Sequence, residues 1–349
     1  MRIREFELSH SPQSLPIRFE SLYATALGHQ LCVIGRDEAR QVRHLSLDSQ
    51  GDVVASTGQL PLVEVTGIAS CAENLVVTGV ATGNRPEVLR VAPSGKMTWH
   101  GELPSGGQFQ HWPRPVEVAN VVLLLSITSR PIAALHLTEL VGDDLGILRS
   151  LALTDDTDGI DVLGDPTTVL LARVHAEGQR LELARIAGDR MISRIEVEAA
   201  RPGSPSLARV NDRIALAWVT EPGEPRLQWF DTKPEPVGGP EILAMPPRGV
   251  VTRVQLMATD SKLAVLLHSV DVVGDAEVVH QPDGALVRDE PRRMFPLYVA
   301  AYDDATHRLG PFSLVDADAR VFVACWLRGK LAVIHRGRET LSSVFELQG

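Results

Sequence analysis

Residues 204–245 read SPSLARVNDRIALAWVTEPGEPRLQWFDTKPEPVGGPEILAM. Four β-runs follow one another in this stretch: SPSLARV (204–210), RIALAWVT (213–220), PRLQWF (225–230) and PEILAM (240–245). Turns rich in Asn, Asp, Gly and Pro separate the runs, as tight hairpins require. The second run is almost continuously apolar, which is typical of a strand covered on both faces. The stretch therefore predicts a four-stranded antiparallel sheet.

The same unit recurs about seven times along the 349 residues. The most apolar run of each unit starts at Leu31, Leu75, Val121, Val169, Ile214, Leu263 and Leu331. The steps between these starts are 44, 46, 48, 45, 49 and 68 residues. A period in the forties with three or four strands per repeat predicts a β-propeller. We expect an all-β, seven-bladed β-propeller that forms a single domain over residues 1–349, because each blade buries its faces against its neighbours.

The two ends of the chain predict how the ring closes. IREFEL (3–8) is a surplus strand ahead of the first unit. The last unit has ARVFVACW (319–326), KLAVIH (330–335) and LSSVFEL (341–347), and then the chain stops without a fourth strand. We expect residues 3–8 to complete the last blade, because this pairing removes an open sheet edge.

The 68-residue step indicates an insertion at residues 269–295, between the second and third strands of blade 6. Within it, AEVVH (276–280) and ALVRD (285–289) flank QPDG (281–284), which predicts a hairpin. Such insertions map to one face of a repeat protein, often the binding face. Two interpretations remain open. The insertion is either a surface loop without a functional role or a flap that contacts a partner, and we favour the second.

Composition excludes several classes of protein. The formal net charge of −10 and the pI near 5.6 argue against a nucleic-acid partner. No apolar run approaches 18 residues, so we expect no membrane partner, and MRIREFELSHSPQ (1–13) lacks the apolar core of a signal peptide. Cys32, Cys71 and Cys325 lie in apolar strands, where free cysteine behaves as a small hydrophobe. We therefore expect a cytoplasmic location.

No common enzyme motif is present in the sequence, and we expect neither a metal nor another cofactor. There is no G-x-S-x-G, no H-E-x-x-H, no phosphate loop and no pair of cysteines at zinc spacing. TDDTDGID (154–161) resembles a calcium loop, but its first position is Thr154 and its twelfth is Asp165 where the loop needs Glu. An acidic loop at a blade junction is the better interpretation.

Arginine recurs at one edge of the predicted blades. The connections between second and third strands contain Arg36, Arg85, Arg130, Arg180, Arg226, Arg292 with Arg293, and Arg336 with Arg338. The starts of the inner strands emerge on the same face and add Arg18, Arg114, Arg253 and Arg320, with Glu64 and Asp161 among them. Such a face suits an anionic ligand or an acidic protein partner. The alternative is ordinary loop arginine, neutralised by neighbours such as Asp37, Glu87, Glu177 and Glu224.

Aromatic residues make up only 5% of the chain, whereas sugar-binding propellers line a face with Trp and Tyr. Four of the five tryptophans fall within strands, and only Trp112, in QHWPRP (110–115), is expected to be exposed near the axis. The candidate binding site therefore comprises Arg18, Glu64, His111, Trp112, Arg114, Asp161, Arg253, Arg292, Arg293 and Arg320.

About 40 residues, the stretch SPSLARVNDRIALAWVTEPGEPRLQWFDTKPEPVGGPEIL (204–243), resemble one blade of bacterial sialidase-like (BNR-type) propellers. The Asp-box S-x-D-x-G-x-x-W of those proteins is absent from the sequence. Among only three tyrosines, Tyr23, Tyr298 and Tyr302, no nucleophile with matching arginines can be assigned. The resemblance implies the fold and gives no support to glycosidase activity.

These observations favour a non-enzymatic binding platform that engages a protein partner with an acidic surface through the arginine-bearing face and the blade 6 hairpin. The alternative is a propeller hydrolase or lyase with its site at the mouth of the central channel, because such sites take one residue per blade and leave no linear motif. Its candidate residues are Glu64, His111, Arg114, Asp161, Arg253 and Arg320. The sequence leaves the oligomeric state open.

Overall fold

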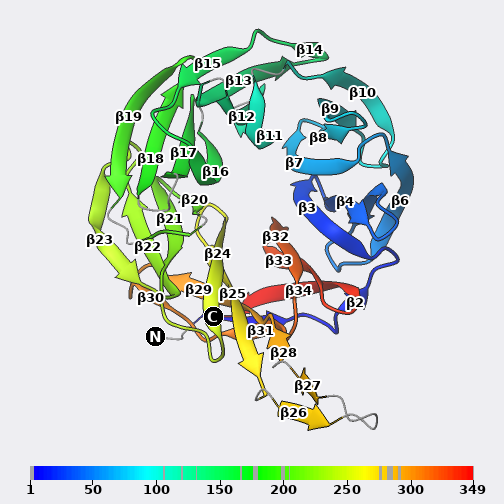
Figure 1. Ribbon diagram of the computed structural model, residues 1–349, viewed down its shortest axis with the longest axis vertical. Helices are drawn as coiled ribbons and strands as arrows, with labels where there is room; N and C mark the ends of the chain where they lie inside the picture. Colours follow the sequence, from blue (N-terminus) through cyan, green and yellow to red (C-terminus); the bar gives the residue numbers. More distant parts are fainter. Residues whose placement is uncertain are drawn as a thin grey trace.

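The computed structural model describes residues 4–104, 107–118, 121–130, 132–165, 167–175, 180–197, 201–203, 205–274, 277–280, 286–289 and 292–348. Among the described residues, seven sheets are arranged as blades around a central axis, and an eighth, two-stranded sheet lies outside the ring (Figure 1). The seven-bladed β-propeller predicted from the repeat is therefore confirmed. No helix among the described residues has the length and apolar character needed to cross a membrane.

The first four blades follow the order of the chain, each running from the axis outward. Blade 1 contains β3 (Phe19–Leu27), β4 (Gln30–Asp37), β5 (Val42–Leu47) and β6 (Val53–Leu60). Blade 2 contains β7 (Glu64–Cys71), β8 (Asn74–Ala81), β9 (Arg85–Val91) and β10 (Met97–Glu102). Blade 3 contains β11 (Gln108–Val118), β12 (Val121–Arg130), β13 (Ala134–Val141), β14 (Asp144–Leu145) and β15 (Arg149–Ala152). Blade 4 contains β16 (Thr157–Asp165), β17 (Thr168–His175), β18 (Leu181–Ala187) and β19 (Arg190–Val197).

The last three blades include the insertion and the junction of the two termini. Blade 5 contains β20 (Ser206–Val210), β21 (Arg213–Thr220), β22 (Glu224–Phe230) and β23 (Pro236–Ile242). Blade 6 contains β24 (Val250–Ala258), β25 (Leu263–Val273), β28 (Arg292–Met294), β29 (Leu297–Asp303), β30 (Arg308–Leu309) and β31 (Ser313–Asp316). Blade 7 contains β32 (Val321–Leu327), β33 (Lys330–Arg336) and β34 (Thr340–Gln348), joined by β1 (Glu5–Leu8) and β2 (Gln13–Ser14).

Burial follows the sequence pattern of each strand. All eight residues of β17 are buried, because a second strand is covered by the blades on both sides. In the outer strand β19, buried or half-buried residues alternate with exposed ones, as a half-covered strand requires. The apolar clusters lie between neighbouring blades; one joins Leu170 of β17 to Leu216 and Trp218 of β21. The core is thus a ring of interfaces between blades.

The N-terminal strand closes the ring. β1 pairs antiparallel with β34, with Glu5 opposite Gln348 and Leu8 opposite Phe345. Phe6 is buried and its ring lies 5.9 Å from that of Trp326 in the same blade. The predicted closure is therefore confirmed. The short strand β2 also pairs with β34, which the sequence pattern did not indicate.

Blade 6 carries a projection from the ring (Figure 1). β25 is longer than the other second strands of the last blades, and its end pairs with β28. Beyond it, β26 (Glu277–His280) pairs with β27 (Leu286–Asp289) as a two-stranded hairpin. The turn QPDG (281–284) expected between these strands lies outside the described residues.

The inner strands approach one another closely at several glycines. A Cβ added to Gly164 of β16 would overlap the carbonyl oxygen of Glu117 in β11. A Cβ on Gly67 of β7 would lie 2.5 Å from Cδ of Pro115, also in β11. Glycine at these positions lets the inner strands of adjacent blades approach this closely.

Candidate functional site

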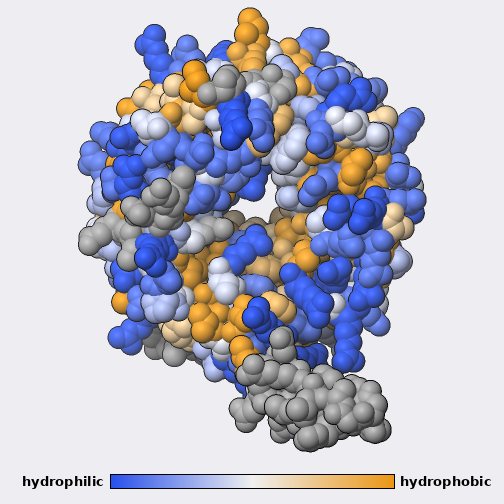
Figure 2. Space-filling view, viewed as in Figure 1, coloured by the Kyte–Doolittle hydropathy of each residue, from blue (hydrophilic) through white to orange (hydrophobic). Residues whose placement is uncertain are grey.

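The inner strands of all seven blades line a channel along the axis of the ring, which is open in Figure 2. Its cavity has a volume of about 1270 Å³. Polar side chains from all seven blades line it, among them Glu20, Tyr23, Thr66, Arg114, Asp161, Arg209, Thr252, Arg253, His268 and Arg320. The channel therefore collects residues that are far apart in the sequence, as the repeat predicts for an axial site.

Two arginines of the channel sit next to irregularities in their strands. The pairing of β11 with β12 shifts register between His111 and Arg114, and the pairing of β24 with β25 shifts between Val251 and Arg253. Such β-bulges change the direction of the following side chain and are common beside functional sites. The guanidinium carbon of Arg253 lies 4.9 Å from the centre of the Phe322 ring, a contact that holds this side chain against blade 7.

The charges of Arg114, Asp161 and Arg253 act on one another across the channel. Desolvation lowers the pKa of Arg253, the Asp161 carboxylate raises it, and the positive charge of Arg114 lowers it again. Burial raises the pKa of the Tyr23 hydroxyl, on which Arg114, Glu64 and Arg253 also act. We call Tyr23, Glu64, Arg114, Asp161 and Arg253 the axial cluster.

Asp161 is already engaged within the protein. Its Oδ2 accepts a hydrogen bond of 2.6 Å from the backbone N–H of Leu207, which joins blade 4 to blade 5. Burial raises the pKa of this carboxyl, whereas the Leu207 N–H and the charge of Arg114 lower it. Asp161 therefore both lines the channel and links two inner strands.

The guanidinium groups of Arg114 and Arg253 have unused donors. Among the described residues, no carboxylate lies within 4.0 Å of either guanidinium and no acceptor hydrogen bonds to them. A guanidinium has five N–H donors in a planar fork that fits a carboxylate or a phosphate. The two arginines are thus the part of the axial cluster best suited to an external anion.

The structure brings Arg320 into the same channel and places Arg18, Arg292 and Arg293 elsewhere. The exposed Arg18 pairs with Glu38 at 3.1 Å, and Arg292 pairs with Asp318 at 3.7 Å. Arg293 lies opposite Val272 on the projection of blade 6. Arg320 is exposed and lines the channel beside Phe322.

His111 and Trp112 are neighbours in β11, and His111 contacts blade 4. The Nε2 atom of His111 lies 2.9 Å from the carbonyl oxygen of Thr157, and burial lowers the pKa of the imidazole. Trp112 is half-buried because its ring packs 4.9 Å from that of Phe109, so the expected exposure near the axis is not observed. His111 thus joins the inner strands β11 and β16, whereas the ring contact of Trp112 lies within β11.

Most arginines between second and third strands have acidic neighbours within reach. Arg36 pairs with Glu20 at 3.2 Å, and Arg226 pairs with Glu224 at 3.1 Å. Arg85 reaches Glu87 at 3.8 Å, and Arg180 reaches Asp155 at 2.7 Å. At these four positions the alternative interpretation therefore holds: the arginines are loop residues whose charge is neutralised by acidic neighbours.

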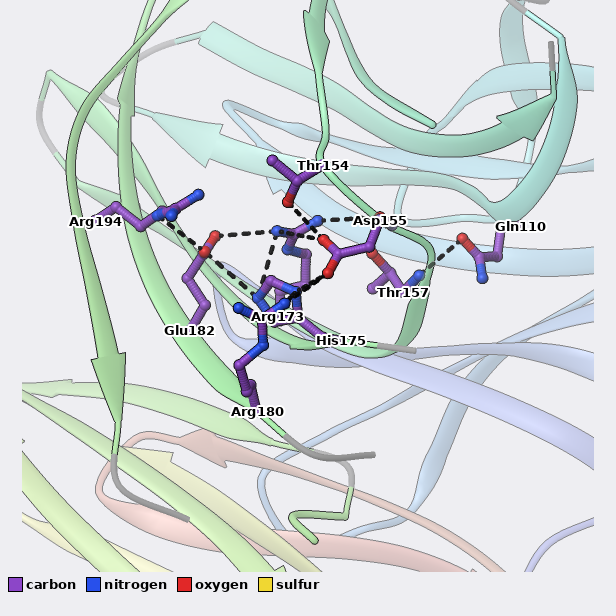
Figure 3. A network of polar contacts seen from close by, with 9 residues as sticks. All are labelled: Gln110, Thr154, Asp155, Thr157, Arg173, His175, Arg180, Glu182 and Arg194. Atoms are coloured by element: carbon purple, nitrogen blue, oxygen red, sulfur yellow. Dashed lines mark hydrogen bonds and ion pairs between the residues drawn. The ribbon is translucent and has the colours of Figure 1, made fainter. Parts of the chain in front are cut away.

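Blade 4 contains a buried polar network that sequence reasoning missed (Figure 3). Arg173 is 1% exposed and contacts Glu182 at 3.4 Å and Asp155 at 3.7 Å. His175 lies between the same two carboxylates, with Nδ1 at 3.0 Å from Asp155 and Nε2 at 3.4 Å from Glu182. The sequence signal was the presence of two polar residues, Arg173 and His175, inside an otherwise apolar second strand. Every member has partners, so the network stabilises the blade and offers no open site.

Comparison with known proteins identifies the architecture alone. No protein-family model matches the chain, and no curated protein matches its sequence. The BP39L lectin from Burkholderia pseudomallei superposes with a TM-score of 0.66 at 13% identity, over 95% of this chain and 98% of the lectin. BBS1N, crystallised in complex with ARL6DN, gives 0.60 at 12% identity, over 98% and 96% of the two chains. BamB from Moraxella catarrhalis gives 0.53 at 13% identity, over 96% and 99%. The chain is similar to these proteins in fold.

Proposed function

We propose that this propeller is a non-enzymatic binding platform that receives an acidic segment of a protein partner at the mouth of its channel. The observation that supports the proposal is the presence of Arg114 and Arg253 in the channel, from blades 3 and 6, with no acceptor among the described residues. Arginine is enriched among the residues that dominate binding at protein interfaces. BBS1N, a protein of similar fold, was crystallised with another protein.

A channel enzyme is the second candidate, favoured by the raised pKa of the Asp161 carboxyl beside two arginines. A carboxyl of raised pKa is a possible general acid. However, Oδ2 of Asp161 accepts from Leu207, and the His111 ring is engaged with Thr157. Asp161 and His111, two of the residues proposed for catalysis, thus already serve contacts between blades, which is why we prefer the platform.

The proposal is tested by reversing the two arginines. The probe is a fluorescein-labelled octapeptide that alternates Glu and Val, measured by fluorescence anisotropy. In Arg114→Glu/Arg253→Glu we expect the affinity to fall more than tenfold, and the wild-type affinity to weaken as salt rises. The control Arg149→Glu/Arg190→Glu makes the same change of charge on the outer strands β15 and β19. Equal affinity in both double variants would overturn the proposal.

The hairpin of blade 6 belongs to the same proposal. Replacing residues 275–291 with a short Gly-Ser turn should leave the propeller folded, because the blade makes its contacts through β24, β25 and β29. We expect an unchanged melting temperature within a few degrees and a weaker affinity for the octapeptide. A variant that loses the cooperative unfolding transition would show that the hairpin is part of the core.

A further inference from the structure

The end of β25 has one open edge. From Leu263 to Val270 this strand pairs with β24 on one side, and β29 lies on its other side. Its last residues, Asp271–Val273, pair with β28 on the β29 side. β24 begins at Val250, opposite Val270, and among the described residues no strand pairs with 271–273 on the β24 side. Blade 6 therefore ends in a short edge that lacks a partner on one side.

Gly249 fixes the point at which β24 begins. Its φ of +80° is a left-handed conformation that glycine adopts without strain. A Cβ at this position would lie 2.8 Å from the carbonyl oxygen of Val270. The chain therefore turns at Gly249 and leaves β25 uncovered beyond Val270.

The register shows which backbone groups face this edge. The N–H of Ser269 donates to the carbonyl of Pro296, toward the β28 and β29 side. The pairings of His268 with Leu297 and of Asp271 with Met294 keep one constant register. Hydrogen-bonding direction alternates along a strand, so the N–H and C=O of Val272 point toward the open side.

Apart from the carboxylate of Asp271, the side chains around the edge are apolar and basic. Val250 is 53% exposed and Val272 is 58% exposed. Arg293 pairs with Val272 across the strands, and residues directly opposite each other share a face of the sheet. Arg248, one residue before Gly249, is also exposed. Arg253 and Thr252 of β24 line the adjoining channel, which makes the edge continuous with the proposed site.

We infer that the open edge of β25 is the docking site for an extended segment of the protein partner, which adds to blade 6 as a further strand. This inference rests on the proposed function. In strand addition, backbone hydrogen bonds give affinity and alternate side chains give specificity. A segment with alternating acidic and apolar residues fits, because its acidic side chains lie on the face of Arg293 while its apolar ones lie on the opposite face, which carries the 50% exposed Val273.

The test separates the backbone of Val272 from its side chain. Val272→Pro removes the free N–H without removing a ladder hydrogen bond, since this N–H points away from β28. Val272→Ala keeps the N–H and shortens the side chain. With the same Glu-Val octapeptide, we expect Val272→Pro to lose more than tenfold in affinity and Val272→Ala to lose less than about threefold, while both keep the wild-type melting temperature. An octapeptide methylated on alternate backbone nitrogens should bind the wild type more than tenfold more weakly.

Other outcomes overturn the inference in distinguishable ways. Unchanged affinity in Val272→Pro, with loss in Arg114→Glu/Arg253→Glu, removes the edge and leaves the proposed function standing. Binding of an all-Glu octapeptide, but not of the Glu-Val peptide, by the wild type would likewise reject the edge and leave the proposed function standing. If light scattering shows a wild-type dimer that Val272→Pro converts to a monomer, the edge is an interface between two copies of this chain. If the affinity for the octapeptide falls in Val272→Pro but not in Arg114→Glu/Arg253→Glu, the channel site itself is rejected.

Discussion

At the scale of single residues, the protein uses charge in two different ways. In blade 4, Arg173 and Glu182 are withdrawn from water and every charge has a partner. In the channel, Arg114 and Arg253 keep unused donors among the described residues. Burying an ion is costly unless a partner compensates it, so the first arrangement supports the fold. The second keeps donors available for binding.

Removing one member of the buried network should be strongly destabilising. Glu182 contacts Arg173 at 3.4 Å, His175 at 3.4 Å and Arg194 at 3.3 Å. Glu182→Ala leaves the buried Arg173 undercompensated, and we expect a loss of about 3–5 kcal/mol in the free energy of unfolding, measured with urea. The control Glu139→Ala breaks the exposed pair with Arg149 and should cost about 1 kcal/mol or less. Similar losses in the two variants would contradict the structural role assigned to the network.

His44 should make stability depend on pH. Burial lowers the pKa of this imidazole to about 4, from an ordinary value of 6.5. Between pH 6.5 and 4, the imidazole of His44 is protonated in the unfolded chain but neutral in the folded chain. The free energy of unfolding therefore falls as the pH drops from 6.5 toward 4. The contribution amounts to about 3 kcal/mol at its full extent. Urea unfolding of wild type and His44→Gln at pH 7, 5.5 and 4.5 should show a shallower loss in the variant, and parallel curves would refute the prediction.

At the scale of elements, the repeat of apolar runs in the sequence predicted the positions of the strands. Continuous apolar runs such as RIALAWVT (213–220) identify the second strands, because only a strand covered on both faces needs them. The surplus run at residues 3–8 identified the closing strand, and β1 pairs as expected. The bulges before Arg114 and Arg253 leave no such pattern, since each depends on how a neighbouring strand pairs. Apart from Tyr23, the members of the axial cluster could therefore be proposed from residue type, but their hydrogen bonds could not.

The close packing of the inner strands leads to a prediction about stability that the sequence repeat alone does not give. A Cβ at Gly164 would overlap the carbonyl of Glu117, so Gly164→Ala must push β16 away from β11. Overpacking of this kind costs about 1–3 kcal/mol. The control Gly58→Ala lies in the outer strand β6, where nothing comes within 4 Å of the added carbon. Thermal unfolding should show a lower melting temperature for Gly164→Ala alone; an equal effect of both variants would mean that the inner strands separate without strain.

At the scale of the whole molecule, stability depends on a closed ring of interfaces between blades. Each apolar cluster is shared by neighbours; the cluster around Leu266, Val299 and Phe345 belongs to blades 6 and 7 together. A ring leaves no terminal blade with an uncovered face, whereas a linear array of blades would leave two. The strand that joins the two ends of the chain is therefore expected to matter to every blade.

Deleting residues 1–9 should open the outer edge of blade 7. The deletion removes β1, so the N–H and C=O groups of β34 between Phe345 and Gln348 lose their partners. It also removes the buried Phe6 from its contact with Trp326. We expect a lower melting temperature and concentration-dependent aggregation through the exposed strand. Phe6→Ala keeps the backbone pairing and loses only the side chain, at a cost of about 3–5 kcal/mol. It should destabilise the protein without aggregation of the folded state. A deletion variant as stable and monomeric as the wild type, measured by calorimetry and light scattering, would show that the ring holds without its closing strand.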